Sequence, residues 1–202
     1  VISFREVLEE NFNGSWPSCA VFNGTHLLVT DELRNIISIF TPEGDLVKTM
    51  GGPGNGEIQF DRPSGITLDS DNNVYIADTL NHRIQKFSPD LEFTQSWGKF
   101  GDAHGLLNAP WGICTDNDNF IYVSDHKNHR VQKFDSDGVF IMSIGEFGSS
   151  ASNLDHPSDV SVDQSGDIYV ADWVNNRVQI YDTTGIHIAG LTGSAVELSK
   201  WQ

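Results

Sequence analysis

The chain has 202 residues, of which 28 are Asp or Glu and 12 are Lys or Arg, so its formal net charge is −16. Nucleic-acid binding depends mainly on Lys and Arg that neutralise phosphates, and this balance therefore argues against a nucleic-acid partner. The sequence has no apolar run of about 18 residues, so we expect no transmembrane helix and no membrane partner. The length suits a single domain over residues 1–202 with a sizeable core.

The N-terminal residues show one weak helical signal, near Glu6 to Phe12. From about residue 16 onward, one pattern recurs four times with a constant period of 47 residues. An aspartate at the end of an apolar run marks the same place in each copy: Asp31, Asp78, Asp125 and Asp172. A fixed period of this size indicates a repeat architecture.

Each copy contains four short runs with the alternation and residue types of β-strands, separated by turns rich in Gly, Pro, Asn and Asp. In the second copy the runs are Ser64 to Asp69, Asn73 to Asp78, Arg83 to Phe87 and Phe93 to Trp97. Four strands in a repeat of this length are typical of a propeller blade. We therefore predict an all-β protein, a β-propeller with four blades in this chain. The expected blades cover about 16–60, 61–107, 108–154 and 155–190, and 191–202 is a tail or the start of a further blade.

The segments Asn81 to Gln85 and Asn128 to Gln132 read AsnHisArgIleGln and AsnHisArgValGln. With the Pro, Gly and Asp residues around them, they resemble the repeats of the NHL-repeat β-propeller family. The fourth copy has AsnAsnArgValGln, and the first has drifted, with Ile36 in place of the arginine. The resemblance implies six blades in the usual closed ring. Two alternatives follow, a small four-bladed ring or a segment of a six-bladed one.

Residues that depart from the repeat are better candidates for function than residues present in every copy. Trp111 and Trp173 depart from it at two loop positions that the strand order places on one face, in neighbouring blades. His126, Lys127 and Trp16 lie in corresponding loops. Exposed aromatic side chains are typical anchors of binding surfaces. We expect a non-catalytic scaffold that presents this face to a protein or peptide, although each tryptophan could instead pack over its own blade.

The alternative is a hydrolase or lyase with a metal-assisted site in the central channel, partly outside this chain. Resemblance points to the peptide-amidating lyases, whose zinc-binding histidines follow the first proline of a blade. Those positions here are Ser18, Ser64, Trp111 and Ser158, so neither a metal site nor catalytic residues are predicted. His82 and His129 belong to the repeated turn of two different blades and are not expected to share a metal. Asp159 replaces the glycine of other copies near the channel and is either a ligand contact or a partner for backbone groups.

The remaining polar patterns favour structural roles. Asp78, Asp125 and Asp172 each precede an arginine by five residues, which predicts ion pairs and bonds to turn amides. The Asp-rich loops of the opposite face suit tight turns, and weak calcium binding is the one cofactor that they leave open. Cys19 and Cys114 fall in blades that are not adjacent, so no disulfide is expected between them. Open edges of the terminal blades would favour self-association.

Overall fold

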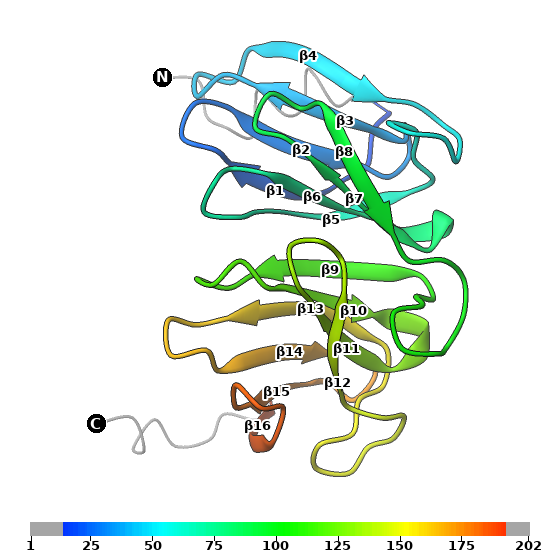
Figure 1. Cartoon of the computed structure of the whole chain (residues 1–202), viewed down its shortest axis with the longest axis vertical. Coiled ribbons are helices and arrows are strands. Elements are labelled where there is room, and N and C mark those ends of the chain that lie inside the picture. Colours follow the sequence, from blue (N-terminus) through cyan, green and yellow to red (C-terminus); the bar gives the residue numbers. More distant parts are fainter. Residues whose placement is uncertain (1–13, 193–202) are drawn as a thin grey trace.

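The computed structural model describes residues 14–192. The helical signal near Glu6 to Phe12 and the residues from 193 onward lie outside this range. Within it, the chain forms four antiparallel sheets of four strands each, which is the predicted all-β propeller architecture. Figure 1 shows β1 to β8 in the upper half of the view, from blue to green, and β9 to β16 in the lower half, from green to red.

The strands have the following bounds. Blade 1 contains β1 (Pro17–Phe22), β2 (Leu27–Asp31), β3 (Ile36–Phe40) and β4 (Leu46–Gly51). Blade 2 contains β5 (Pro63–Leu68), β6 (Val74–Asp78), β7 (Arg83–Phe87) and β8 (Phe93–Trp97). Blade 3 contains β9 (Pro110–Thr115), β10 (Ile121–Asp125), β11 (Arg130–Phe134) and β12 (Phe140–Ile144). Blade 4 contains β13 (Pro157–Val162), β14 (Ile168–Asp172), β15 (Arg177–Tyr181) and β16 (His187–Thr192), which ends two residues after the expected end of this blade.

The connection between the second and third strands of a blade is a tight turn with a left-handed residue. Two of these turns form short 3₁₀ segments, η1 (Thr79–Asn81) and η2 (His126–Asn128). The residue after each segment has a positive φ, 57° at His82 and 55° at His129. Asn occupies the equivalent place in blades 1 and 4, and Asn and His tolerate this conformation better than most residues with a Cβ. The AsnHisArg and AsnAsnArg sequences of the repeat therefore satisfy the same backbone requirement.

The hydrophobic core lies between the blades rather than inside any one of them. One buried cluster joins blades 1 and 2 through side chains such as Ile37 and Ile66. A second joins blades 2 and 3, where Tyr75 packs with Ile113, and a third joins blades 3 and 4. Each sheet thus buries an apolar face against its neighbour, and burial of that area is the main force that stacks the blades.

The four blades form an open arc. The inner strand of each blade packs on that of the next, in the order β1, β5, β9 and β13. Within residues 14–192, β13 does not pack against β1 in this way, and the closed four-bladed ring considered above is therefore not the arrangement found. Accordingly β1 is largely exposed, whereas most of β5 is buried. No helix in the described part of the chain has the length and apolar character to span a membrane.

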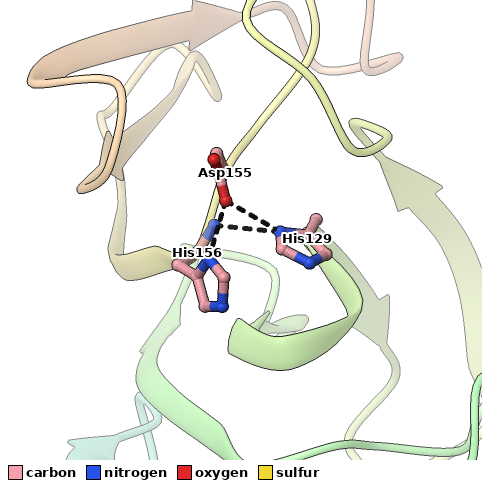
Figure 2. Close-up of side chains that lie close together, drawn as sticks. All are labelled: His129, Asp155 and His156. Atoms are coloured by element: carbon pink, nitrogen blue, oxygen red, sulfur yellow. Dashed lines mark hydrogen bonds and ion pairs between the residues drawn. The ribbon is translucent and has the colours of Figure 1, made fainter.

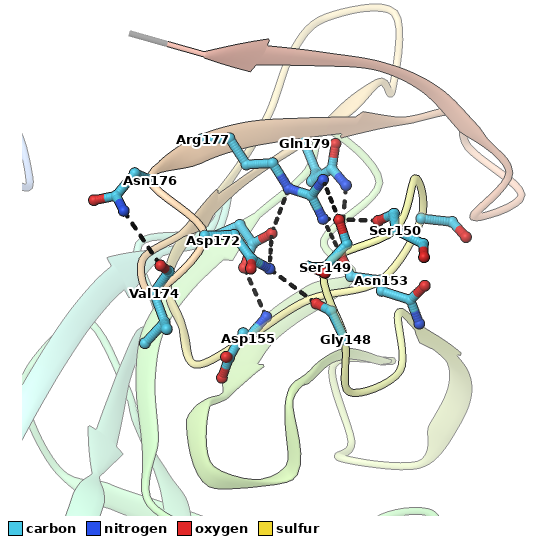
Figure 3. Close-up of polar contacts among 12 residues, drawn as sticks. Gly148, Ser149, Ser150, Asn153, Asp155, Asp172, Val174, Asn176, Arg177 and Gln179 are labelled. Atoms are coloured by element: carbon cyan, nitrogen blue, oxygen red, sulfur yellow. Dashed lines mark hydrogen bonds and ion pairs between the residues drawn. The ribbon is translucent and has the colours of Figure 1, made fainter.

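A buried network built on the repeated aspartate ties each of blades 2, 3 and 4 to the loop that precedes it. In blade 4, Arg177 donates to Asp172 at 2.7 Å and to the carbonyl oxygens of Ser150 and Asn153, both at 2.8 Å (Figure 3). Asp172 also accepts the backbone amide of Asp155 at 2.7 Å. The same bonds recur around Asp78 and Asp125, which confirms the predicted ion pairs.

Burial raises the pKa of Asp78 and Asp125, and hydrogen bonds from the amides and arginines around them oppose that rise. Blade 1 is the exception. Ile36 replaces the arginine, Arg34 lies 3.9 Å from the carboxylate, and Asp31 Oδ2 is buried with no hydrogen-bond partner among the described residues.

Candidate functional site

The loops that carry the predicted contact residues lie where one blade meets the next. The side chain that follows the repeated aspartate reaches the carbonyl oxygen of the next blade's first proline. Thr79 Oγ1 donates to Pro110 O at 2.8 Å, and His126 Nδ1 lies 3.1 Å from Pro157 O. Because a carbonyl oxygen only accepts, Nδ1 carries the hydrogen of His126 in this bond.

His126 differs from the expectation of an exposed loop side chain. It is buried, and this burial lowers its pKa to about 4, so the ring is neutral near pH 7. The threonine at this position in the preceding blade makes the same bond, so the side chain here serves first to link two neighbouring blades. A direct contact of His126 with a partner is therefore not what its position supports. Its ring instead forms part of the base on which the neighbouring tryptophans rest.

Trp111 and Trp173 come together on this face, as their positions in the repeat predict. Their rings meet edge to face with centroids 5.9 Å apart. His126 contacts both, with centroids 4.6 Å from Trp111 and 6.0 Å from Trp173. Trp173 is 58% exposed, whereas Trp111 is half-buried, so the pair presents one open and one partly covered ring.

A shallow hollow of about 170 Å³ lies beside Trp111 on the same face. Lys127, Leu80 and Arg62 are among its lining residues, and Arg62 forms an ion pair with Glu32 at 2.9 Å at its edge. The structure thus places Lys127 next to Trp111 and His126 on this face. Its positive charge stands out because basic residues are scarce in the chain as a whole.

Two other predicted residues lie apart from this group. Trp16 is 61% exposed on blade 1, and no ring contact within residues 14–192 joins it to the tryptophans of blades 3 and 4. Asp159 lies on the inner strand β13, where its carboxylate accepts its neighbour Val160's amide at 2.9 Å. The residue is exposed overall, yet local desolvation raises the pKa of its carboxyl. Its closeness to Gly112 on β9 leaves no room there for a Cβ.

The Asp-rich loops of the opposite face follow the predicted turn chemistry. Asp69, Asp116 and Asp163 each accept two backbone amides of their own turn and a tyrosine hydroxyl two residues past the turn. Cys19 and Cys114 are both free thiols, and burial raises the pKa of Cys114. These loops and thiols are thus accounted for by local structure.

The sequence analysis missed one cluster, which consists of His129, Asp155 and His156 (Figure 2). His156 Nδ1 lies 2.6 Å from Asp155 Oδ1, and His129 Nδ1 lies 3.2 Å from the same oxygen. Desolvation, followed by the nearby His156, lowers the pKa of His129. A signal was present in the repeat, because Asp155 and His156 stand where blade 3 begins with Asn108 and Ala109.

Comparison with known proteins agrees with this architecture. The model of the NHL repeat matches residues 60–87, 107–134 and 154–181. No curated protein matches the chain at a significant level. The chain is similar to a solved streptogramin B lyase, with 16% identity and a TM-score of 0.68, over 87% of this chain and 54% of that one.

Two further structures give the same result. A catalytically inactive virginiamycin B lyase from Staphylococcus aureus, solved with quinupristin, has 19% identity and a TM-score of 0.68, over 89% of this chain and 56% of that one. The WD40 repeats of RRP9 have 11% identity and a TM-score of 0.68, over 85% and 50% of the two chains. This chain therefore spans about half the length of these structures, and at such identities the likeness concerns the fold alone. Together, the three matched repeats and the four-stranded blades show that the chain belongs to the NHL-repeat β-propeller family.

Proposed function

We propose that this chain is a non-catalytic binding scaffold for a protein or peptide. The contact surface consists of Trp111, Trp173 and Lys127, with His126 beneath the rings and Trp16 as an outlying contact. One observation carries the proposal: the two tryptophans that depart from the repeat meet edge to face, 5.9 Å apart, on one loop face.

The chemistry of this surface suits a partner that combines an apolar side chain with an acidic group. The hollow beside Trp111 is mostly apolar and accepts the former, and Lys127 at its wall attracts the latter. NHL-type and WD40-type propellers generally mediate protein interactions, which is consistent with this use of the face. Because the blades hold the loops rigidly, little conformational entropy is lost when a partner binds.

The proposal is tested by selecting peptides from a displayed random library against the chain and measuring the affinity of those enriched. Trp111→Ala and Trp173→Ala should each weaken binding by about 30-fold or more, as expected for aromatic hot spots. Phe100→Ala is the matched control, because Phe100 is 67% exposed and no ring contact within residues 14–192 joins it to the tryptophan pair. Peptides that bind both tryptophan variants as well as the parent chain would contradict the proposal.

A lyase or hydrolase with a channel site is the second candidate, and the raised pKa of Asp159 is the observation that favours it. Asp159→Gly restores the residue of blades 2 and 3 at this position and tests the idea directly. If the protein turns over a substrate beside Asp159, the variant should lose that turnover and keep its peptide affinity. Unchanged turnover would remove Asp159 from the reaction.

A further inference from the structure

The junction between blades 3 and 4 differs from the two preceding junctions at a set of equivalent positions. The αL residue of the turn in one blade faces the loop that leads into the next blade. The three sets are Asn35 with Asp61 and Arg62, His82 with Asn108 and Ala109, and His129 with Asp155 and His156. Of these, the last alone brings two imidazole rings and a carboxylate together.

One interblade hydrogen bond is common to all three junctions, and it is longest in the third. The loop amide donates to Asn35 Oδ1 at 2.7 Å, to His82 Nδ1 at 3.0 Å and to His129 Nδ1 at 3.2 Å. Since a backbone amide only donates, His129 Nδ1 must carry a lone pair to accept this bond. Asp155 Oδ1, which also carries lone pairs, lies 3.2 Å from that nitrogen. In the tautomer that accepts this amide, His129 Nδ1 and Asp155 Oδ1 face each other with no hydrogen between them, and Asp155 Oδ1 accepts its hydrogen bond from His156 Nδ1 at 2.6 Å instead.

A metal ion accepts electron pairs from two such atoms at once. Zn²⁺ binds imidazole nitrogen and carboxylate oxygen at about 2.0–2.2 Å, and tetrahedral geometry then separates neighbouring ligand atoms by roughly 3.3 Å. The 3.2 Å between His129 Nδ1 and Asp155 Oδ1 matches that separation, whereas His156 Nδ1, now hydrogen-bonded to the same oxygen at 2.6 Å, must move away from it to ligate the ion. His156 adds a second imidazole, and one ligand atom from each of the three residues lies within 4.8 Å of the others.

We propose that His129, Asp155 and His156 bind a divalent transition-metal ion, with Zn²⁺ as the best match, and so link blades 3 and 4. Three protein ligands leave one tetrahedral position for water or for a group of a partner. The side chains are 20%, 19% and 36% exposed in the order given, so an ion can enter from solvent. The ion replaces the long amide bond at His129, and the ring hydrogen of His156 moves to Nε2 if that ring ligates through Nδ1.

The surroundings hold these ligands in position. The amide of Asp155 donates to Asp172, which Arg177 fixes in turn (Figure 3). The ring of Phe147 lies against His129 with centroids 4.5 Å apart, and His126 lies 4.9 Å from His156. These contacts restrict the backbone of Asp155 and the rings of His129 and His156. The inference does not depend on the proposed partner binding, because none of the three ligands is a tryptophan-pair residue.

The test is a calorimetric titration of the full chain, freed of metal by a chelator, with Zn²⁺, and a parallel titration with Co²⁺ followed by visible absorption. The wild type should bind one equivalent, and Co²⁺ should give the intense bands of a tetrahedral site. The double change Asp155→Asn with His156→Ala gives this junction the residues of the junction between blades 2 and 3, so it should fold. Its affinity should fall by about 100-fold or more.

The reciprocal change, Asn108→Asp with Ala109→His, places the same residue types opposite His82 and should add a second equivalent. It decides the question if the first double variant is unstable. His26→Ala in blade 1 controls for surface histidines and should leave the titration unchanged. A weak site with a dissociation constant of about 1 μM would be filled at 100 times that concentration of Zn²⁺. The proposal is overturned if the wild type takes up no Zn²⁺ under those conditions. It is equally overturned if the wild type and a folded Asp155→Asn, His156→Ala variant bind alike.

Discussion

The junction between blades 2 and 3 and the junction between blades 3 and 4 use one backbone plan with different side chains. In both, a side chain after the repeated aspartate reaches the carbonyl of the next proline: the Thr79 hydroxyl in one, the His126 ring in the other. A hydroxyl completes the bond and adds little surface. An imidazole completes the same bond and also gives Trp111 and Trp173 a ring to pack on. The repeat thus fixes the hydrogen bond and leaves the side chain free to acquire a second role.

The largest effects should be those that the two junctions share. Arg130→Met leaves the carboxylate of Asp125 buried without its charged partner, and Arg177→Met does the same to Asp172. Loss of one member of a buried pair costs about 3–5 kcal/mol, so both variants should lose that much free energy of unfolding in urea. Arg62→Met, which breaks the exposed pair with Glu32, should change it by less than about 1 kcal/mol. A marked difference between the two buried-pair variants would show that the junctions are not built alike.

The next effect separates the bond from the ring at His126. His126→Ala removes the donor to the Pro157 carbonyl and should lower the free energy of unfolding by about 1–3 kcal/mol. His126→Thr introduces the residue that blade 2 uses for the same bond, and it should recover most of that loss. Urea unfolding of the two variants measures the difference. If threonine were no better than alanine, the bond in blade 2 would not be a model for the bond in blade 3.

Much of the fold followed from the sequence because the repeat states the same constraints several times. The 47-residue period gave the blades, and the Asp–Arg spacing gave the ion pairs at Asp78, Asp125 and Asp172. Whether the ring closes did not follow. Closure depends on the angle at which inner strands such as β1 and β5 pack, and the residue types in the strands do not specify that angle.

The candidate site was predictable only in part. Trp111 and Trp173 could be placed on one face because strand direction alternates within a blade. The burial of His126 could not, because its partner, Pro157, belongs to the next blade. The cluster at His129 was missed for the same reason, since residues 27 positions apart meet across a junction whose geometry the alternating pattern does not describe.

The smallest effect concerns pH and the turn residue of blade 2. Burial, followed by the charge of Lys127, lowers the pKa of His82 below its ordinary value near 6.5. Protonation therefore favours the unfolded chain, and the contribution of His82 to stability is complete above pH 6.5 and declines as the pH falls below it. Blade 1 accepts the same interblade amide with Asn35, which does not titrate.

His82→Asn should accordingly leave the free energy of unfolding nearly unchanged at pH 8. Between pH 6.5 and 5, the free energy of unfolding of the variant should fall less with pH than that of the wild type. At pH 5 the variant should be more stable than the wild type by less than about 1 kcal/mol, because the His82 ring is partly exposed and solvent screens its charge. Urea unfolding at pH 8, 6.5 and 5 measures both quantities on the same samples. If the variant were as acid-sensitive as the wild type, His82 would contribute to stability through packing on Phe100 rather than as a neutral hydrogen-bond acceptor. Asn35 would then make the equivalent hydrogen bond in blade 1 without the same contribution to stability.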